Sequence, residues 1–180
     1  DVCSSDLAAM MVLGVVVSLL GVRRLRRRAW DIHSRRAQEI LSQCCREMGV
    51  DRRVRLIESD RVSGPCLIGV LRPSIVMPEG LVEDLSDQQL RFVFRHELAH
   101  LRRWDLPFNW LLLGVRTIHW FNPLAWYVAR RILEDREEIC DAIAVDGRSE
   151  ACRPYGELLL QLAERPGSRA WLDRSAAGCV

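Results

Sequence analysis

An apolar run followed by a block of arginines lies at the start of the sequence. Residues 7–22 carry no charge, and five arginines occur among residues 23–28. Sixteen helical residues span about 24 Å, slightly less than the ~30 Å hydrocarbon core of a bilayer. Because basic residues flank only one side, the pattern predicts a transmembrane helix within residues 1–28, with the following segment in the cytoplasm. The alternative is a buried core helix.

Shorter helical and strand-like patterns follow this segment. Residues 29–49 repeat apolar side chains at helical spacing, and residues 53–59 alternate as a strand does. Two short apolar runs, residues 66–71 and 74–77, are bounded by glycines and prolines, which predicts a hairpin or a pair of short strands. We expect an extended peptide substrate to add to the sheet edge near Ile75 to Met77.

A well-marked helix is predicted from Ser86 to about Arg103. Ser86 and Gln89 form the S-x-x-Q pattern of a capping box, and Asp87 in the first turn suits the helix dipole. Apolar side chains at helical spacing continue the pattern and should face the core: Leu90, Val93, Phe94 and Leu101.

Three further segments complete the predicted order of elements. Residues 109–119 are mostly apolar but include an arginine and a histidine, which indicates a core or membrane-surface helix rather than a second span. Asn122, followed by proline, has the features of an N-cap, and a long helix should run from there to near Gly147. Residues 154–164 predict a shorter amphipathic helix, and residues 166–180 a flexible tail or linker.

Composition narrows the function classes. Hydrophobic residues make up 49% of the 180 and charged residues 28%, which fits a folded domain. The net charge of +2 gives no indication of a nucleic-acid partner, and no aromatic residues interleave the arginine block as they would in a nucleic-acid-binding arm. Seven cysteines, an odd number without a C-x-x-C pair, argue against a disulfide framework and a cysteine zinc site. Reduced thiols in the cytosol fit best.

The sequence HELAHLRRWD contains the metal-binding pattern H-E-x-x-H. His96 and His100 lie four residues apart and so share one helix face, where both imidazoles can reach one Zn²⁺. Glu97 is offset by one residue and can reach a metal-bound water as general base. The alternative is a helix with two partly buried, hydrogen-bonded histidines.

A catalytic zinc ion needs a third protein ligand from another element. His33 and His119 are the other histidines, in the basic segment and in an apolar run. Glu137 is the better candidate, because Asp141 lies one turn beyond it and can accept a hydrogen bond from a ligand histidine. The alternative is a solvated acidic helix face.

Together, HELAHLRRWD, IHWFNPLAW and EDREEICD resemble the BlaR/MecR-type integral-membrane zinc metallopeptidases. PSIVMPEGL and the approach LSDQQLRFVF also match that family, and the resemblance extends over most of the chain. It implies a gluzincin with one catalytic Zn²⁺ and the following roles: His96, His100 and Glu137 as ligands, Glu97 as base, and Asp141 behind a ligand. Asp105 also matches a position of the family motif and is expected to brace the zinc helix or bond a ligand. The position of Cys140 within the motif suits packing better than ligation.

The expected fold is therefore α+β and predominantly helical. A gluzincin-like peptidase domain over residues 29–165, with a small strand element before the zinc helix, follows the transmembrane segment of residues 1–28. An oxyanion donor is also required. The sequence does not choose among Tyr127, His119, the arginines and Tyr155, and Tyr155 is retained as the candidate.

The expected function is hydrolysis of peptide bonds on the cytoplasmic side of the cell membrane by an integral zinc metalloendopeptidase. We expect a regulatory role, by repressor cleavage or self-cleavage, with a protein or peptide substrate, membrane lipid around the N-terminal helix, and no direct nucleic-acid contact. The alternatives are a prenyl-protein or quality-control membrane protease, and a sensor fragment without general proteolytic activity. The W-F-N-P element argues against the first.

Overall fold

The computed structural model describes residues 2–165 of the chain, so the predicted tail of residues 166–180 lies outside the described part. A mostly helical α+β fold is present, as predicted. The elements in chain order are α1 (Val2–Arg28), β1 (Trp30–Asp31), α2 (Arg35–Glu47), β2 (Arg55–Ser59), β3 (Cys66–Ile68), β4 (Ser74–Pro78), α3 (Leu81–Asp84), α4 (Asp87–Arg102), α5 (Asp105–Ile118), α6 (Pro123–Ala144) and α7 (Ser149–Glu164).

The four strands form one small mixed sheet in the order β1-β2-β4-β3. The predicted pair of short strands is confirmed as antiparallel β3 and β4, with Cys66 opposite Val76. The expectation of a substrate edge at Ile75 to Met77 is wrong, because β4 also pairs with β2 in parallel and is therefore an inner strand. An apolar run indicates a buried strand but does not reveal its neighbours. The edge strands are β1 and β3.

Helix α4 lies at the centre of the domain, in contact with β3, α2, α5, α6 and α7. The predicted capping box is confirmed: the Gln89 N–H donates to Ser86 Oγ (3.3 Å), and the Ser86 N–H donates to Gln89 Oε1 (2.9 Å). The four predicted apolar anchors of this helix are all buried. They belong to a core that extends to β4, α2, α3 and α7.

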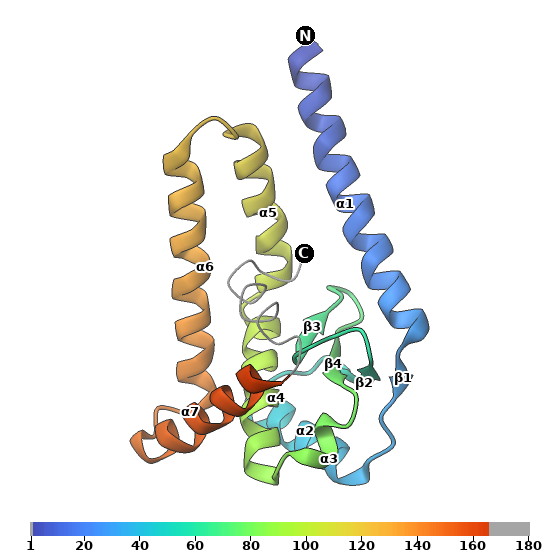
Figure 1. Cartoon of the computed structure of the whole chain (residues 1–180), viewed down its shortest axis with the longest axis vertical. Coiled ribbons are helices and arrows are strands. Elements are labelled where there is room, and N and C mark those ends of the chain that lie inside the picture. The colour runs from blue at the N-terminus through green and yellow to red at the C-terminus, as the bar shows by residue number, and fades with distance from the viewer. Residues whose placement is uncertain (1, 166–180) are drawn as a thin grey trace.

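Helices α5 and α6 form an antiparallel hairpin that extends toward the same end of the molecule as the N-terminal half of α1 (Figure 1). The predicted N-cap is confirmed, since Asn122 Oδ1 accepts a hydrogen bond from the Leu124 N–H at 3.0 Å. Trp104, with φ of 59°, separates α4 from α5. The final helix α7 begins at Ser149, five residues earlier than predicted, with Pro154 inside it.

The N-terminal prediction needs a correction. A helix does cover the apolar run, but none of the helices within residues 2–165 is both long and apolar enough to cross a membrane. The predicted transmembrane helix of residues 1–28 is therefore not found. Its basic last turn, Arg26 to Arg28, lies near the sheet, where α1 ends and the chain enters β1 (Figure 1).

Candidate metal centre

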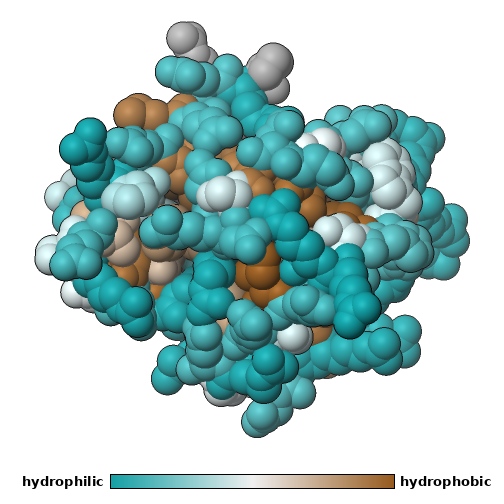
Figure 2. Space-filling view, turned by 90° about the horizontal axis from the view of Figure 1, so that it is seen from below, coloured by the Kyte–Doolittle hydropathy of each residue, from teal (hydrophilic) through white to brown (hydrophobic). Residues whose placement is uncertain are grey.

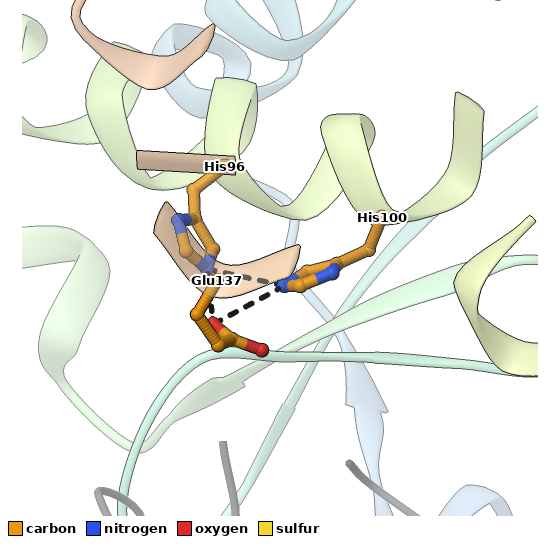
Figure 3. Close-up of side chains that lie close together, drawn as sticks. All are labelled: His96, His100 and Glu137. Atoms are coloured by element: carbon orange, nitrogen blue, oxygen red, sulfur yellow. Dashed lines mark hydrogen bonds and ion pairs between the residues drawn. The ribbon is translucent and has the colours of Figure 1, made fainter. Parts of the chain in front are cut away.

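Two histidines of α4 and one glutamate of α6 converge on a single point (Figure 3). The Nε2 atoms of His96 and His100 are 3.1 Å apart, and Glu137 Oε2 lies 3.6 Å and 3.8 Å from them. Two ligands bound tetrahedrally at about 2.05 Å from one ion are about 3.3 Å apart. The three atoms thus have nearly the separations that a bound metal ion requires. They are two imidazole nitrogens and one carboxylate oxygen.

The ring of His96 is held from behind by α6 and α7. Its Nδ1 lies 3.0 Å from Asp141 Oδ1 and 3.2 Å from the Tyr155 hydroxyl, which itself donates to Asp141 Oδ1 at 2.6 Å. A carboxylate at Nδ1 accepts a hydrogen bond from the N–H there, which fixes the proton on Nδ1 and leaves the lone pair of Nε2 available for a metal.

The ring of His100 has the same arrangement with different partners. Its Nδ1 lies 2.7 Å from Oδ2 of Asp105, a buried carboxylate in the first turn of α5. Arg136 of α6 forms an ion pair with the other oxygen of Asp105, and its guanidinium lies 4.1 Å from the centre of the Phe108 ring. Both histidines therefore have Nδ1 against a carboxylate and Nε2 directed at Glu137.

Glu97 lies beside this cluster and is buried. Burial raises the pKa of its carboxyl, while the positive charges of His96 and His100 and a hydrogen bond from the backbone of Leu67 in β3 act in the opposite direction. A raised pKa brings a carboxylate closer to the pH at which it exchanges protons efficiently.

His96 and Asp141 are coupled by their charges. Burial alone would lower the pKa of His96, but hydrogen bonds to Asp141 and Glu137 outweigh it and raise that pKa to about 10. Burial acts against ionisation of Asp141 as well, yet His96 and Tyr155 keep its pKa below the usual value. The pair thus shares a proton that a metal ion would displace from His96.

A second group of polar atoms adjoins the first. Cys140 Sγ lies 3.4 Å from His100 Nδ1 and 3.8 Å from Asp105 Oδ2. Burial, with help from Glu137, raises the pKa of this thiol to about 12. A neutral thiol is a weak hydrogen-bond donor and a poor metal ligand. Cys140 therefore suits packing against Asp105, in keeping with its expected role.

The structure does not bring the other predicted candidates to the cluster. His33 and His119 are both exposed, and His119 ends α5 at the far end of the hairpin. The Tyr155 hydroxyl lies at Nδ1 of His96, behind the ring, which does not support its expected role as oxyanion donor. Sequence reasoning missed Arg136, because its link to Asp105 depends on how α5 packs against α6.

Comparison with known proteins agrees with this geometry. The family model described as BlaR1 peptidase M56 matches residues 6–176. The chain is 27% identical to Regulatory protein BlaR1 of Bacillus licheniformis over 85% of the chain and 26% of that protein. It is 34% identical to the Methicillin resistance mecR1 proteins of Staphylococcus aureus and Staphylococcus epidermidis over 57% of the chain and 18% of each relative. The chain thus spans at most about a quarter of the length of these relatives, and it belongs to the BlaR1 peptidase M56 family.

Proposed function

We propose that this chain is the peptidase part of a zinc-dependent metalloendopeptidase, with His96, His100 and Glu137 as the metal ligands. One observation carries the proposal: three ligand atoms of the correct chemistry converge at near-tetrahedral separations beside the buried Glu97. Two imidazoles and one carboxylate are a common ligand set of catalytic zinc, and they leave a fourth position for water.

The residues around the ligands have separate tasks in the proposed reaction. When bound, zinc lowers the pKa of a water molecule toward ~7 and polarises the scissile carbonyl. Glu97 accepts the proton of the attacking water and returns it to the leaving amine. Asp141 and Asp105 fix the rings of His96 and His100, and we assign Tyr155 to holding Asp141 in place.

The position of the substrate follows from the sheet. Strand β3 lies at its edge, and the backbone of Leu67 in this strand contacts the catalytic candidate Glu97. A peptide that pairs with the outer edge of β3 would therefore pass beside the ligand cluster in an extended conformation.

We further propose a regulatory role, in which the substrate is a specific protein, with a transcriptional repressor or the chain itself as the candidates. The support is the similarity to proteins named for regulation and for methicillin resistance. Both substrate candidates predict limited cleavage at few sites rather than general degradation.

The ligand assignment is tested by measuring the metal content of the purified chain and of a His100→Ala variant. We expect about one zinc ion per wild-type chain after equilibration with several divalent metals, and a large loss in the variant. A wild-type chain that binds no zinc would refute the ligand set.

The base assignment is tested by cleavage of a peptide library by wild type and by Glu97→Gln. We expect a loss on the order of 10²–10⁴-fold with zinc still bound, because general-base catalysis contributes about that much. Undiminished cleavage by the variant would show that Glu97 is not the base.

A further inference from the structure

The end of the α5–α6 hairpin has an unusual surface. We call residues 111–128, which include the last two turns of α5 and the first two of α6, the apolar end. Trp120 and Phe121 in the turn are 67% and 68% exposed, and Leu124 and Tyr127 on α6 are 63% and 62% exposed. Large apolar side chains are thus exposed at consecutive turns of both helices, far from the core around α4.

The apolar end continues onto a neighbouring helix. Helix α1 packs along α5, where Gly14 lies close to Leu113, and its exposed side chains near that contact are also aliphatic. By contrast, the opposite end of the molecule is covered mostly by hydrophilic residues (Figure 2). The exposed apolar residues are therefore concentrated at one end of the molecule.

Charged side chains mark where this surface stops. Arg130 and Arg131, both exposed, follow the apolar residues of α6 and are paired with Glu134. The first turn of α6 at Pro123 lies seven residues before Arg130, or about 10 Å along the helix axis. Within the apolar end, Arg116 places its guanidinium 4.2 Å from the centre of the Trp126 ring, which shields that charge.

We propose that the apolar end inserts into one face of a lipid bilayer as a hairpin that does not cross it. Apolar groups of interfacial helices reach about 5–10 Å into the boundary between headgroups and acyl chains, and end-on insertion of α6 from Pro123 to Arg130 would reach a similar depth. Tryptophan and tyrosine favour that boundary, and arginines behind them can pair with lipid phosphates. The inference does not depend on the proposed peptidase activity.

A second copy of the chain fits this surface less well. Protein interfaces are usually broad patches with a polar rim. Here the exposed apolar residues belong to the turn and the adjoining helix ends of a hairpin, whose course Figure 1 shows. The basic residues beyond them, Arg130 and Arg131 on α6 with Arg23 and Arg24 on α1, would meet the same charges on a second copy but opposite charges on anionic lipid.

Two tryptophans of equal exposure provide the test. Trp126 in the apolar end and Trp30 in β1 are both 44% exposed, and each Nε1–H donates a hydrogen bond within the chain. Variants of the full chain that retain only Trp126 or only Trp30 would be mixed with vesicles of phosphatidylethanolamine and phosphatidylglycerol that carry bromine on the upper acyl chain. We expect strong quenching of Trp126 and little of Trp30. Equal quenching, or none, would overturn the proposal.

A matched pair of substitutions keeps the test independent of the tryptophan replacements. Phe121 is 68% exposed in the turn of the hairpin and Leu160 is 65% exposed on α7. We expect Phe121→Asp to weaken vesicle binding on the order of tenfold or more, and Leu160→Asp to leave it unchanged. Equal effects of the two substitutions on vesicle binding would contradict insertion by the hairpin. A second contradicting result would be a wild-type chain that does not bind vesicles but self-associates in lipid-free buffer, with the self-association abolished by Phe121→Asp.

Discussion

The two halves of α6 have opposite relations to their surroundings. Its first turns expose leucine, tryptophan and tyrosine, while its later turns bury Leu133 and Cys140 and direct Glu137 toward the histidines of α4. One continuous helix thus has an outward apolar surface at one end and an inward polar cluster at the other. Hydrophobic spacing is helical in both halves, so spacing alone does not reveal which half faces the core.

Substitutions in the two regions should also differ in their cost to stability. Around the cluster, Glu97, Asp105 and Cys140 are buried, so that removing a polar partner leaves a buried group unsatisfied. At the apolar end the side chains are exposed, so that their removal costs little stability unless a lipid layer covers them. Substitutions in the two regions should therefore change different measured quantities.

The largest effect is expected on removing Glu137, the ligand that we propose α6 supplies. Glu137→Ala should reduce zinc affinity on the order of 10³-fold or more, because even residues that only orient ligands contribute about 10–100-fold. Competition with a chromophoric chelator measures the affinity. Glu138→Ala, at the exposed neighbouring residue, is the matched control and should bind zinc normally. Vesicle binding should be the same in both variants. A change in vesicle binding would show that metal binding and membrane binding do not depend on separate regions.

Two phenylalanines compare the core with the apolar end directly. Phe94 of α4 is completely buried and Phe121 is 68% exposed. Phe94→Ala should lower the free energy of unfolding by about 3–5 kcal/mol, since it removes buried contacts and leaves a cavity. Phe121→Ala should change it by no more than about 0.5 kcal/mol in lipid-free buffer. Urea unfolding measures both, and similar losses would mean that Phe121 has a hidden structural partner.

A smaller effect is expected behind His100. Asp105→Asn keeps the shape of the side chain but removes the charge that faces His100 and Arg136. Zinc affinity should fall about 10–100-fold, while the fold is retained. Asp135→Asn, at an exposed position on α6, should have no such effect. Unaltered affinity in the first variant would show that ordering of the His100 ring does not depend on this carboxylate.

The last prediction concerns protons. A raised pKa of about 10 keeps His96 protonated at neutral pH in the metal-free chain, whereas metal binding requires its neutral form. Zinc binding at pH 7 should therefore release about one proton from His96, and affinity should rise as pH increases toward 10. Calorimetry in buffers of different ionisation enthalpy counts the protons. Asp141→Asn should reduce the number, and an unchanged count would contradict the charge coupling.

Several features could be predicted from the sequence because they depend on local spacing. The pair His96 and His100 follows from four-residue spacing on a helix, and the capping box follows from Ser86 and Gln89 three residues apart. Glu137 could also be predicted, because it lies one turn before Asp141 on a predicted helix, and the site needs a third ligand from another element.

Other features depend on tertiary contacts and had no local signal. The ion pair between Asp105 and Arg136 joins α5 to α6 and exists only because these helices pack together. The inner position of β4 results from its parallel pairing with β2. The sequence gives no signal for this pairing, because β3 lies between the two strands in the chain. The apolar run at the N-terminus does form a helix, but none of the helices within residues 2–165 is both long and apolar enough to cross a membrane.

The uninterrupted course of α6 has a consequence for substrate selection. Glu137 lies fourteen residues beyond Pro123, which corresponds to about 21 Å along a straight helix axis. With the hairpin anchored in lipid, this helix would act as a fixed spacer and hold the cleaving groups at one height above the membrane. Susceptible bonds would then be chosen partly by their distance from the bilayer, so that a sequence moved further from the membrane by an inserted linker would escape cleavage.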